Sequence, residues 1–255
     1  MTTPTIEQIY KHSSVRSYKT DPVPRELVET IVAAGQRAST SSNMQLYSVV
    51  AVSEQATRNK LAELCGDQAH IRQAPLFLAW CADVSMVHRA CELRQHQHVA
   101  SSMENFLVAA VDVALLMQTA TLAAESLGLG MCYIGGIRNN PQQVIELLHL
   151  PPYVMPISGM TLGWPNAEPN IRPRLPLEAI LHWETHDKSR EDAALHAYDK
   201  AMIETGIYDG RQVPVPGKEG EMEEYGWLEH TARRVSRPNR VHLRGVIENQ
   251  GFALE

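Results

Sequence analysis

Hydrophobic residues recur along the chain with two periods, which predicts a mixture of helices and strands. Thr5 and Gln8 resemble a capping box at the start of a short helix over residues 6–11. Pro24 occupies a plausible first helical position before an apolar stripe at helical spacing. Further helices are predicted over 54–64, 103–127, 140–148, 222–235 and 240–250, and strands over 46–52, 76–81, 131–134 and 155–164. Because no steady strand–helix–strand rhythm is present, the pattern indicates an α+β fold.

The predicted helix over 103–127 is apolar around most of its circumference. Asp112, Gln118 and Glu125 interrupt it, so we expect a buried helix and not a membrane span. After about Pro176 charge rises and apolar runs become short. We therefore expect a core over residues 1–184 and a helical arm over 185–255, which is part of the same domain or packs on a partner subunit.

The charge and the cysteines limit the partners and the compartment. A formal net charge of −6 over 255 residues argues against a general attraction to nucleic acid or to an anionic membrane. The four cysteines show no Cys-x-x-Cys spacing, and we expect them to be reduced and mostly buried. Residues 1–10 lack the basic and apolar regions of a secretory signal, so we expect a cytoplasmic protein.

Hydrolytic and metal-binding motifs do not occur in the sequence. It contains no Gly-x-Ser-x-Gly, no His-Glu-x-x-His and no Walker loop. The histidines at 88, 96 and 98 lack a ligand spacing, and we expect a solvated surface or loop there. Gly128 and Gly130 fail as a dinucleotide fingerprint because the third glycine is missing and the pair precedes a strand. The pair is better explained as the end of the long helix.

Two segments carry arginines in arrangements suited to an anion. If the turn after the first helix is helical, His12 and Arg16 share a face with two serines between them, which would cradle a phosphate. The alternative is a surface loop with one salt bridge. Proline between Arg172 and Arg174 favours an extended backbone, so both side chains should point to one side. They would bind one anion or, alternatively, two separate carboxylates.

Two further segments are suited to a planar heteroaromatic ring. The polar run Ser39–Gln45 offers hydroxyl and amide groups, although a plain loop explains its composition equally well. The run Tyr133–Arg138 contains Gly135 and Gly136, whose backbone N–H groups can approach a ring without a Cβ in the way. A tight turn is the alternative for this second segment.

Together these four segments resemble the nitroreductase superfamily, and specifically its oxygen-insensitive NADPH nitroreductase and NAD(P)H–FMN reductase branch. The matching strings are IYKHSSVRSY, ASTSSNMQLYSVV, AAESLGLGMCYIGGIRNN, and GMTLGWP followed by IRPRLP. Their order and approximate spacing match over about residues 1–184, and the tail matches more loosely. The resemblance implies a central, mostly antiparallel sheet flanked by helices. It also implies an intertwined homodimer with an FMN at each subunit interface.

The resemblance also assigns roles by position. The FMN phosphate and its surroundings are assigned to His12, Ser13, Ser14, Arg16, Arg172 and Arg174. The ribityl chain and pyrimidine edge are assigned to Ser41, Gln45 and Gln68, and the surroundings of flavin N5 to Tyr133, Ile134, Gly135 and Gly136. NADPH or NADH and the substrate would meet Arg16, Ser42, Arg138, Arg211 and Arg234, with Arg233 and Arg237 as further candidates. Many relatives have Arg at Ser13 and Lys at Arg172, and these departures bear on FMN affinity and on nucleotide preference.

The activity implied is a ping-pong cycle. Hydride passes from NAD(P)H to flavin N5, and a nitroaromatic, a quinone, an azo compound or free flavin then takes the electrons. Because the flavin carries the chemistry, neither a catalytic side chain nor a metal is expected. Three alternatives stay open: an FMN storage or delivery protein with little turnover, a flavoenzyme of the same fold with another acceptor or reaction, and an interaction protein without flavin.

Overall fold

A computed structural model describes residues 2–99, 102–168 and 170–254. The chain forms two compact units, residues 1–169 with 240–255, and residues 170–239. The boundary expected after residue 184 lies inside the second unit, and the last helix belongs to the first.

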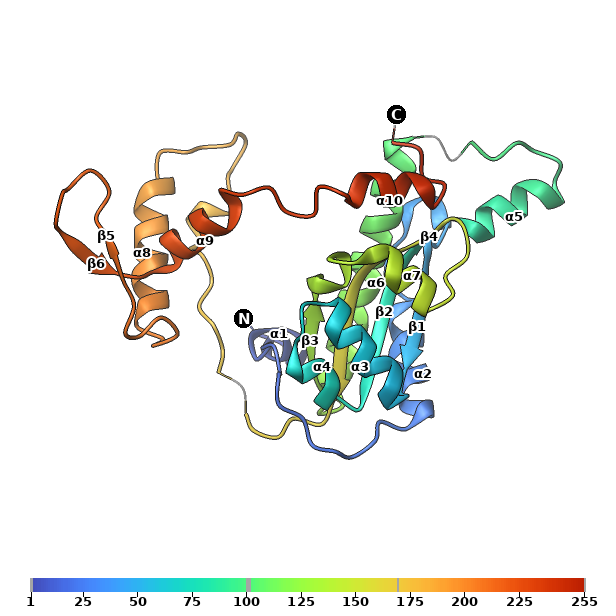
Figure 1. Cartoon of the computed structure of the whole chain (residues 1–255), viewed down its shortest axis with the longest axis horizontal. Helices are drawn as coiled ribbons and strands as arrows, with labels where there is room; N and C mark the ends of the chain where they lie inside the picture. Colours follow the sequence, from blue (N-terminus) through green and yellow to red (C-terminus); the bar gives the residue numbers. More distant parts are fainter. Residues whose placement is uncertain (1, 100–101, 169, 255) are drawn as a thin grey trace. The chain divides into compact units, whose positions relative to one another are not determined.

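A four-stranded antiparallel sheet forms the centre of the first unit (Figure 1). Its strands are β1 (Tyr47–Val52), β2 (Leu76–Asp83), β3 (Gly130–Ile134) and β4 (Val154–Gly163). They are arranged in the order β1-β2-β4-β3, with every neighbouring pair antiparallel. The edge strands are thus β1 and β3, and β2 and β4 separate them.

Helices cover both faces of this sheet. The helices of the first unit are α1 (Pro4–Tyr10), α2 (Arg25–Gly35), α3 (Gln55–Leu64), α4 (Ala69–Gln73), α5 (Ser85–Leu93), α6 (Met103–Ser126), α7 (Pro141–Leu147) and α10 (Leu243–Asn249), with 3₁₀ turns η1 (Ser41–Asn43) and η2 (Gly135–Arg138); α5 projects away from the sheet (Figure 1). The sequence pattern did not predict α4 and α5, of whose residues Ile71 alone is buried.

The starts of the first two helices correct the prediction. Helix α1 begins at Pro4, and Thr3 caps it by accepting a hydrogen bond from the backbone N–H of Ile6. A capping box at Thr5 and Gln8 is therefore wrong, because both residues lie inside the helix. Pro24 occupies the position just before α2, which begins one residue later.

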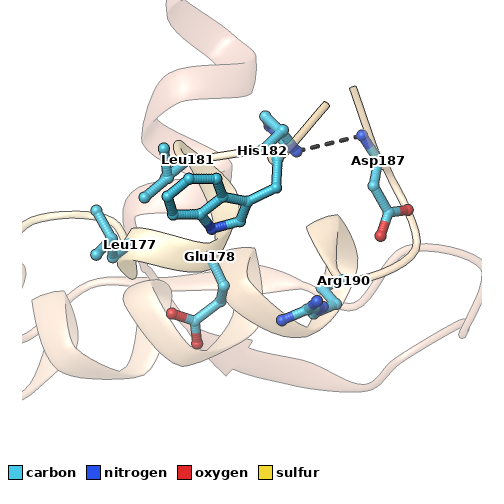
Figure 2. Close-up of a pocket in the computed structure, with 7 residues that line it drawn as sticks. Leu177, Glu178, Leu181, His182, Asp187 and Arg190 are labelled. Atoms are coloured by element: carbon cyan, nitrogen blue, oxygen red, sulfur yellow. Dashed lines mark hydrogen bonds between the residues drawn. The ribbon is translucent and has the colours of Figure 1, made fainter. Parts of the chain in front are cut away.

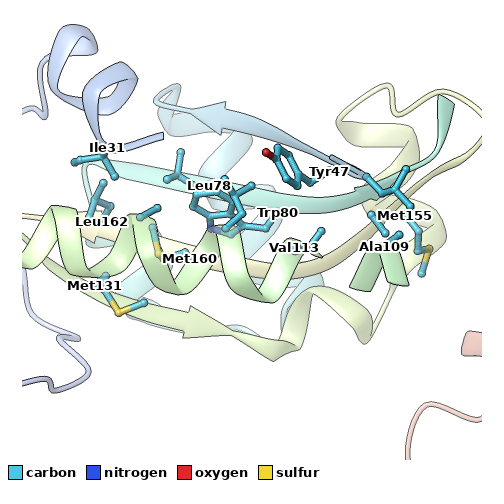
Figure 3. Close-up of a cluster of buried hydrophobic side chains, with 14 of the residues drawn as sticks. Ile31, Tyr47, Leu78, Trp80, Ala109, Val113, Met131, Met155, Met160 and Leu162 are labelled. Carbon is cyan, nitrogen blue, oxygen red and sulfur yellow. The ribbon is translucent and has the colours of Figure 1, made fainter. Parts of the chain in front are cut away.

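The two sides of β2 contribute to two separate cores. Leu78 and Trp80 pack with Val113 of α6 in one cluster, which also contains buried residues of α2 (Figure 3). Phe77 and Ala79 pack in the other cluster, with residues of α3, α4 and α7. Because successive side chains of a strand point to opposite faces, a strand covered on both faces is apolar throughout. All eight residues of β2 are buried.

Helix α6 is buried on one side only. By length and composition it is long and apolar enough to cross a membrane, but it lies against the sheet and α2. On its outer side Met103, Leu107, Val111 and Leu115 are 51%, 54%, 48% and 42% exposed. These four residues recur every four positions and form one apolar stripe, which we call the α6 stripe.

The second unit has a small core of its own. It contains η3 (Leu177–Ala179), α8 (Glu191–Ile203), a two-stranded sheet of β5 (Gln212–Pro214) and β6 (Met222–Glu224), and α9 (Trp227–Val235). Its buried side chains are Ala194, Met202, Tyr208 and Val213. The helix expected over 222–235 is thus wrong at its start, because residues 222–224 pair as a strand.

Candidate functional site

The segment from His12 to Arg16 is extended and lies along the edge strand β3. The backbone N–H of Val15 donates a hydrogen bond to the carbonyl of Met131 over 2.8 Å, and Ser14 forms a parallel bridge with the same residue. Burial alternates: Ser13 and Val15 are buried, and Ser14 and Arg16 are exposed. The condition of a helical turn is therefore not met here. The period-two alternation of an extended chain places Ser14 and Arg16 on the same side.

Arg16 and Ser14 meet the thiol of Cys132 on β3. Burial raises the pKa of that thiol, while the charge of Arg16 and hydrogen bonds from Ser14 and Arg16 lower it. His70 on α4 also lies within the field of Arg16: burial lowers the pKa of His70, and the charge of Arg16 lowers it further. The side chains of Ser14, Arg16, His70 and Cys132 thus form one group, which we call the Arg16 group.

His12 is held at the other end of this segment. Its Nδ1 lies 2.6 Å from Oε1 of Glu125, near the end of α6. The Glu125 side chain is 8% exposed and that of His12 is 23% exposed. This contact fixes the start of the segment, so an anion at His12 would share the imidazole with a carboxylate.

A glycine brings η2 into close contact with the chain between α3 and α4. A Cβ added at Gly136 would overlap the carbonyl oxygen of Cys65 and would lie 2.8 Å from Nε2 of Gln68. The same Gln68 amide donates a hydrogen bond to the Cys65 carbonyl over 2.8 Å. The predicted site residues Gln68 and Gly136 are therefore neighbours in the structure.

The side chains of Tyr133 and Ile134 point to opposite faces of the sheet. The Tyr133 hydroxyl lies 2.6 Å from Oγ1 of Thr121 on α6, and burial raises the pKa of Tyr133 to about 12. Ile134 is buried in the core on the opposite face of the sheet. Any contact of these two residues with a ligand would come from their backbone.

The loop with Ser41, Ser42 and Gln45 is organised by a buried carboxylate. Asp112 of α6 accepts hydrogen bonds from the backbone N–H groups of Ser41 and Leu46, over 3.1 and 3.2 Å. Ser42 and Gln45 have left-handed backbones, with φ of 49° and 55°. This strained conformation is local to the loop and is held by Asp112.

This loop precedes β1, whereas the Arg16 group lies at β3, on the other edge of the sheet. Three strand spacings separate the edges, roughly 14 Å. The loop borders a surface cavity of about 410 Å³ with the α6 stripe, lined by Ser41, Leu107, Val111 and Leu115 among others. The chain thus brings together Ser14, Arg16, Gln68 and Gly136 in two neighbouring groups, and Ser41, Ser42 and Gln45 in a third, separate place.

The predicted arginines Arg172, Arg174, Arg211 and Arg234 belong to the second unit. Arg172 donates a hydrogen bond to Oγ1 of Thr205 over 3.2 Å, and Arg174 donates to the carbonyls of Arg172 and Pro173. The Arg211 guanidinium lies over the ring of Tyr225, 5.7 Å from its centre. The roles assigned to these three residues and to Arg234 stay predictions.

A hollow of about 330 Å³ in the second unit contains none of the predicted residues (Figure 2). Its lining includes His182, Asp187 and Arg190, and the backbone N–H of Asp187 donates a hydrogen bond to Nδ1 of His182 over 3.2 Å. Trp183 beside it is 79% exposed. We assign this hollow no role.

The described residues contain no group of three or more side chains suited to a metal ion. His96 is exposed and lies with His98 outside helices and strands, as expected, while the Nδ1 atoms of His88 and His98 lie 3.1 Å apart and both rings pack on Tyr153. Cys65, Cys81 and Cys132 are free and buried, and Cys91 is half-buried, as expected.

Sequence reasoning missed His70 and Asp112 as residues of these groups. Nε2 of His70 is buried without a hydrogen-bond partner among the described residues. The available signal was its place two residues after Gln68. A five-residue helix gives too short a pattern to predict from periodicity.

Comparisons with known proteins show the family to which the chain belongs. The model of the nitroreductase family matches residues 9–164, and that of the nitroreductase family C-terminal domain matches residues 172–255. FMN reductase [NAD(P)H] of Bacillus subtilis is 40% identical over 253 residues, 98% of each chain. The structure of B. megaterium NfrA2 is 35% identical with a TM-score of 0.91 and covers 100% of both chains. NADPH:FMN oxidoreductase from Vibrio harveyi, solved in complex with NAD⁺, is 32% identical with a TM-score of 0.85, covering 99% of this chain and all of that one.

Proposed function

Because this chain belongs to the nitroreductase family, we propose that it is an FMN-dependent NAD(P)H oxidoreductase that reduces small-molecule acceptors. The observation that carries the proposal is the Arg16 group beside the close approach of Gly136 to Cys65 and Gln68. The names of the relatives support FMN and a nicotinamide nucleotide as its two cofactors.

The Arg16 group fits the anionic end of FMN. The guanidinium gives charge-assisted, bidentate contacts to phosphate, and the Ser14 hydroxyl adds a further donor. The unpartnered Nε2 of His70 lies in the same group, and a buried polar atom without a partner destabilises the protein unless a ligand satisfies it. In this proposal Arg16 and Ser14 bind the phosphate, and His70 donates to the adjoining part of the cofactor.

The contact between Gly136 and Gln68 is suited to the planar ring of FMN. With no Cβ, the backbone of Gly135 and Gly136 leaves room for a flat ring, and backbone N–H groups there would donate to it. Gln68, fixed by its bond to the Cys65 carbonyl, would present its amide oxygen to the ring edge. When bound, FMN accepts hydride from the nucleotide and passes electrons to the acceptor. The chain's own residues bind and orient the ring and stabilise its negative charge.

We also propose a homodimer assembled on the α6 stripe. An exposed apolar stripe of this size on a core helix is typical of a protein interface. The stripe borders the Ser41 loop, which in one subunit lies on the opposite sheet edge from the Arg16 group. A second subunit on the stripe would supply its own Ser41, Ser42 and Gln45 to complete the site. Buried, unpaired cysteines support a reducing compartment such as the cytoplasm.

The test is an absorbance spectrum of the purified protein, followed by anaerobic addition of NADH and then NADPH. We expect a visible flavin band that bleaches within the mixing time, and the faster donor gives the nucleotide preference. A band that persists with both donors would favour a storage or delivery protein. A colourless protein that ignores added FMN would contradict the proposal.

A further inference from the structure

Two arginines lie side by side at the end of η2, outside the Arg16 group. Arg138 closes η2, and Arg240 begins the segment that returns to the first unit before α10. Burial lowers the pKa of Arg138, and the charge of Arg240 lowers it further. Because Arg240 bonds to the side chain of Asn139, which follows Arg138 directly in the chain, the two arginines are also neighbours in space.

Neutral partners hold both side chains. Nη1 of Arg138 donates to the carbonyl of Ile157 on β4. Nε of Arg240 donates to Oδ1 of Asn139 over 2.9 Å. Neither arginine lies within ion-pair distance of a carboxylate in the part of the chain that the structure describes. A guanidinium has five N–H donors, so each arginine keeps donors free after these bonds.

The position of the pair relates it to the proposed reaction. Nη2 of Arg138 lies 3.4 Å from the point where a Cβ on Gly135 would be. The pair thus borders the two glycines at which we place the planar end of FMN. Two half-buried cations without a carboxylate repel each other, and an anion between them removes the repulsion.

We propose that Arg138 and Arg240 form a second anion site, which binds a phosphate group of a substrate that arrives at the flavin. This inference rests on the proposed function and adds Arg240 as a residue that sets specificity. The phosphate has three possible sources: the 2′-phosphate of NADPH, the pyrophosphate shared by NADH and NADPH, and the phosphate of free FMN as acceptor. Their shared chemistry is a phosphate oxyanion held by two planar guanidinium groups.

The variant to test is Arg240→Ala, with Arg244→Ala as the matched control. Arg244 lies in the same segment, is exposed, and is paired with Glu248 on its own helix. Steady-state KM is measured for NADPH, NADH, FMN and riboflavin. We expect the KM of at least one phosphate-bearing substrate to rise about 10- to 100-fold in the Arg240 variant. Riboflavin, which lacks phosphate, should be unaffected by either variant.

The set of substrates whose KM rises identifies which phosphate group binds to the site. A rise for NADPH alone indicates the 2′-phosphate, a rise for both nucleotides indicates the pyrophosphate, and a rise for FMN but not riboflavin indicates the acceptor phosphate. Unchanged KM for NADPH, NADH and FMN would overturn the proposal.

A second measurement does not depend on turnover. Isothermal titration of the purified protein with inorganic pyrophosphate and with 2′,5′-ADP should show binding that Arg240→Ala weakens and Arg244→Ala leaves unchanged. Absence of binding to wild-type protein, or equal binding by both variants, would overturn the anion site. If the protein holds no flavin but this titration succeeds, the oxidoreductase proposal fails while the anion site stands.

Discussion

The buried carboxylate of Asp112 on α6 accepts a hydrogen bond from the backbone N–H of Ser41, over 3.1 Å. Its second oxygen accepts from Leu46, so one side chain fixes both ends of the loop that carries Ser41, Ser42 and Gln45. The helix of the α6 stripe and the loop assigned to the flavin are thereby joined. Stability, flavin binding and assembly are expected to be coupled through this carboxylate.

Asp112→Asn tests that coupling. The amide keeps the shape but turns an NH₂ group toward one of the two backbone N–H donors, leaving a buried donor unpaired. We expect a loss of about 1–3 kcal/mol in the free energy of unfolding, together with weaker FMN binding. Denaturant unfolding and fluorescence titration with FMN measure the two effects. Glu104→Gln, an exposed change on the same helix, is the control; equal behaviour of both variants would contradict the role of Asp112.

Gly136→Ala tests the close approach of η2. Its Cβ would overlap the Cys65 carbonyl, so η2 or the α3–α4 connection must shift. We expect a loss of about 1–3 kcal/mol in unfolding free energy and a lower flavin content after purification. Gly245→Ala in α10 meets no atom within 4 Å and should stabilise the helix by about 0.5–1 kcal/mol. A Gly136 variant with the stability and flavin content of wild type would show that the structure accommodates the added Cβ without cost.

Arg16→Ala and Arg174→Ala test the phosphate assignment. If each guanidinium binds the FMN phosphate, each replacement should weaken FMN binding by about 1.5–3 kcal/mol. Equilibrium titration of the apoprotein with FMN gives the affinity. Arg25→Ala removes an arginine whose side chain is 89% exposed on α2 and should leave the affinity unchanged. Unchanged affinity in both test variants would rule out the assignment.

The lowered pKa of His98 predicts that the protein loses stability in acid. Burial lowers its pKa below the ordinary value of 6.5, and the neighbouring His88 lowers it further. In the pH range between the two values the unfolded chain binds the extra proton, so stability rises with pH there. The contribution is present above about pH 6.5 and is lost as pH falls through the folded-state value. Tyr153 and, through His88, Glu92 are the other titratable groups in contact with this pair.

Thermal unfolding of His98→Asn at pH 5.5 and 7.5 measures this effect. The variant should lose less stability on acidification than wild type, and exposed His96→Asn should behave as wild type. Part of the slope should persist, because the pKa of His70 is lowered as well. A slope identical to that of wild type would show that His98 does not contribute.

Leu107→Asp with Val111→Asp tests the proposed dimer. Two carboxylates on the α6 stripe would be desolvated at an interface, so the variant should sediment as a monomer and hold less FMN. Met86→Asp adds a charge at an apolar position on α5 that is 68% exposed and should leave the mass unchanged. Wild-type protein that sediments as a monomer would contradict the dimer. Analytical ultracentrifugation measures each case.

The sequence by itself determined the helices and strands whose buried side follows from the local spacing of apolar residues. The helix expected over 103–127 ends one residue earlier in the structure, and all four strands of the main sheet lie where apolar runs placed them. Four motifs in order also indicated the family, which the matches over residues 9–164 and 172–255 confirm. Short or polar elements such as α4, α5 and α8 were missed, since too few of their positions are buried to set a period.

Only the tertiary structure decided how the site is put together. The extended backbone of His12–Arg16 depends on β3, with which it pairs from more than a hundred residues away. Arg240 reaches Asn139 across 101 residues, and His70 lies in the field of Arg16. Local periodicity records which side of an element avoids water, but the contacts between elements follow from the order of the strands and from the chain's return to the first unit. For that reason the sequence predicted candidate residue types, and the fold decided which of these candidates are neighbours.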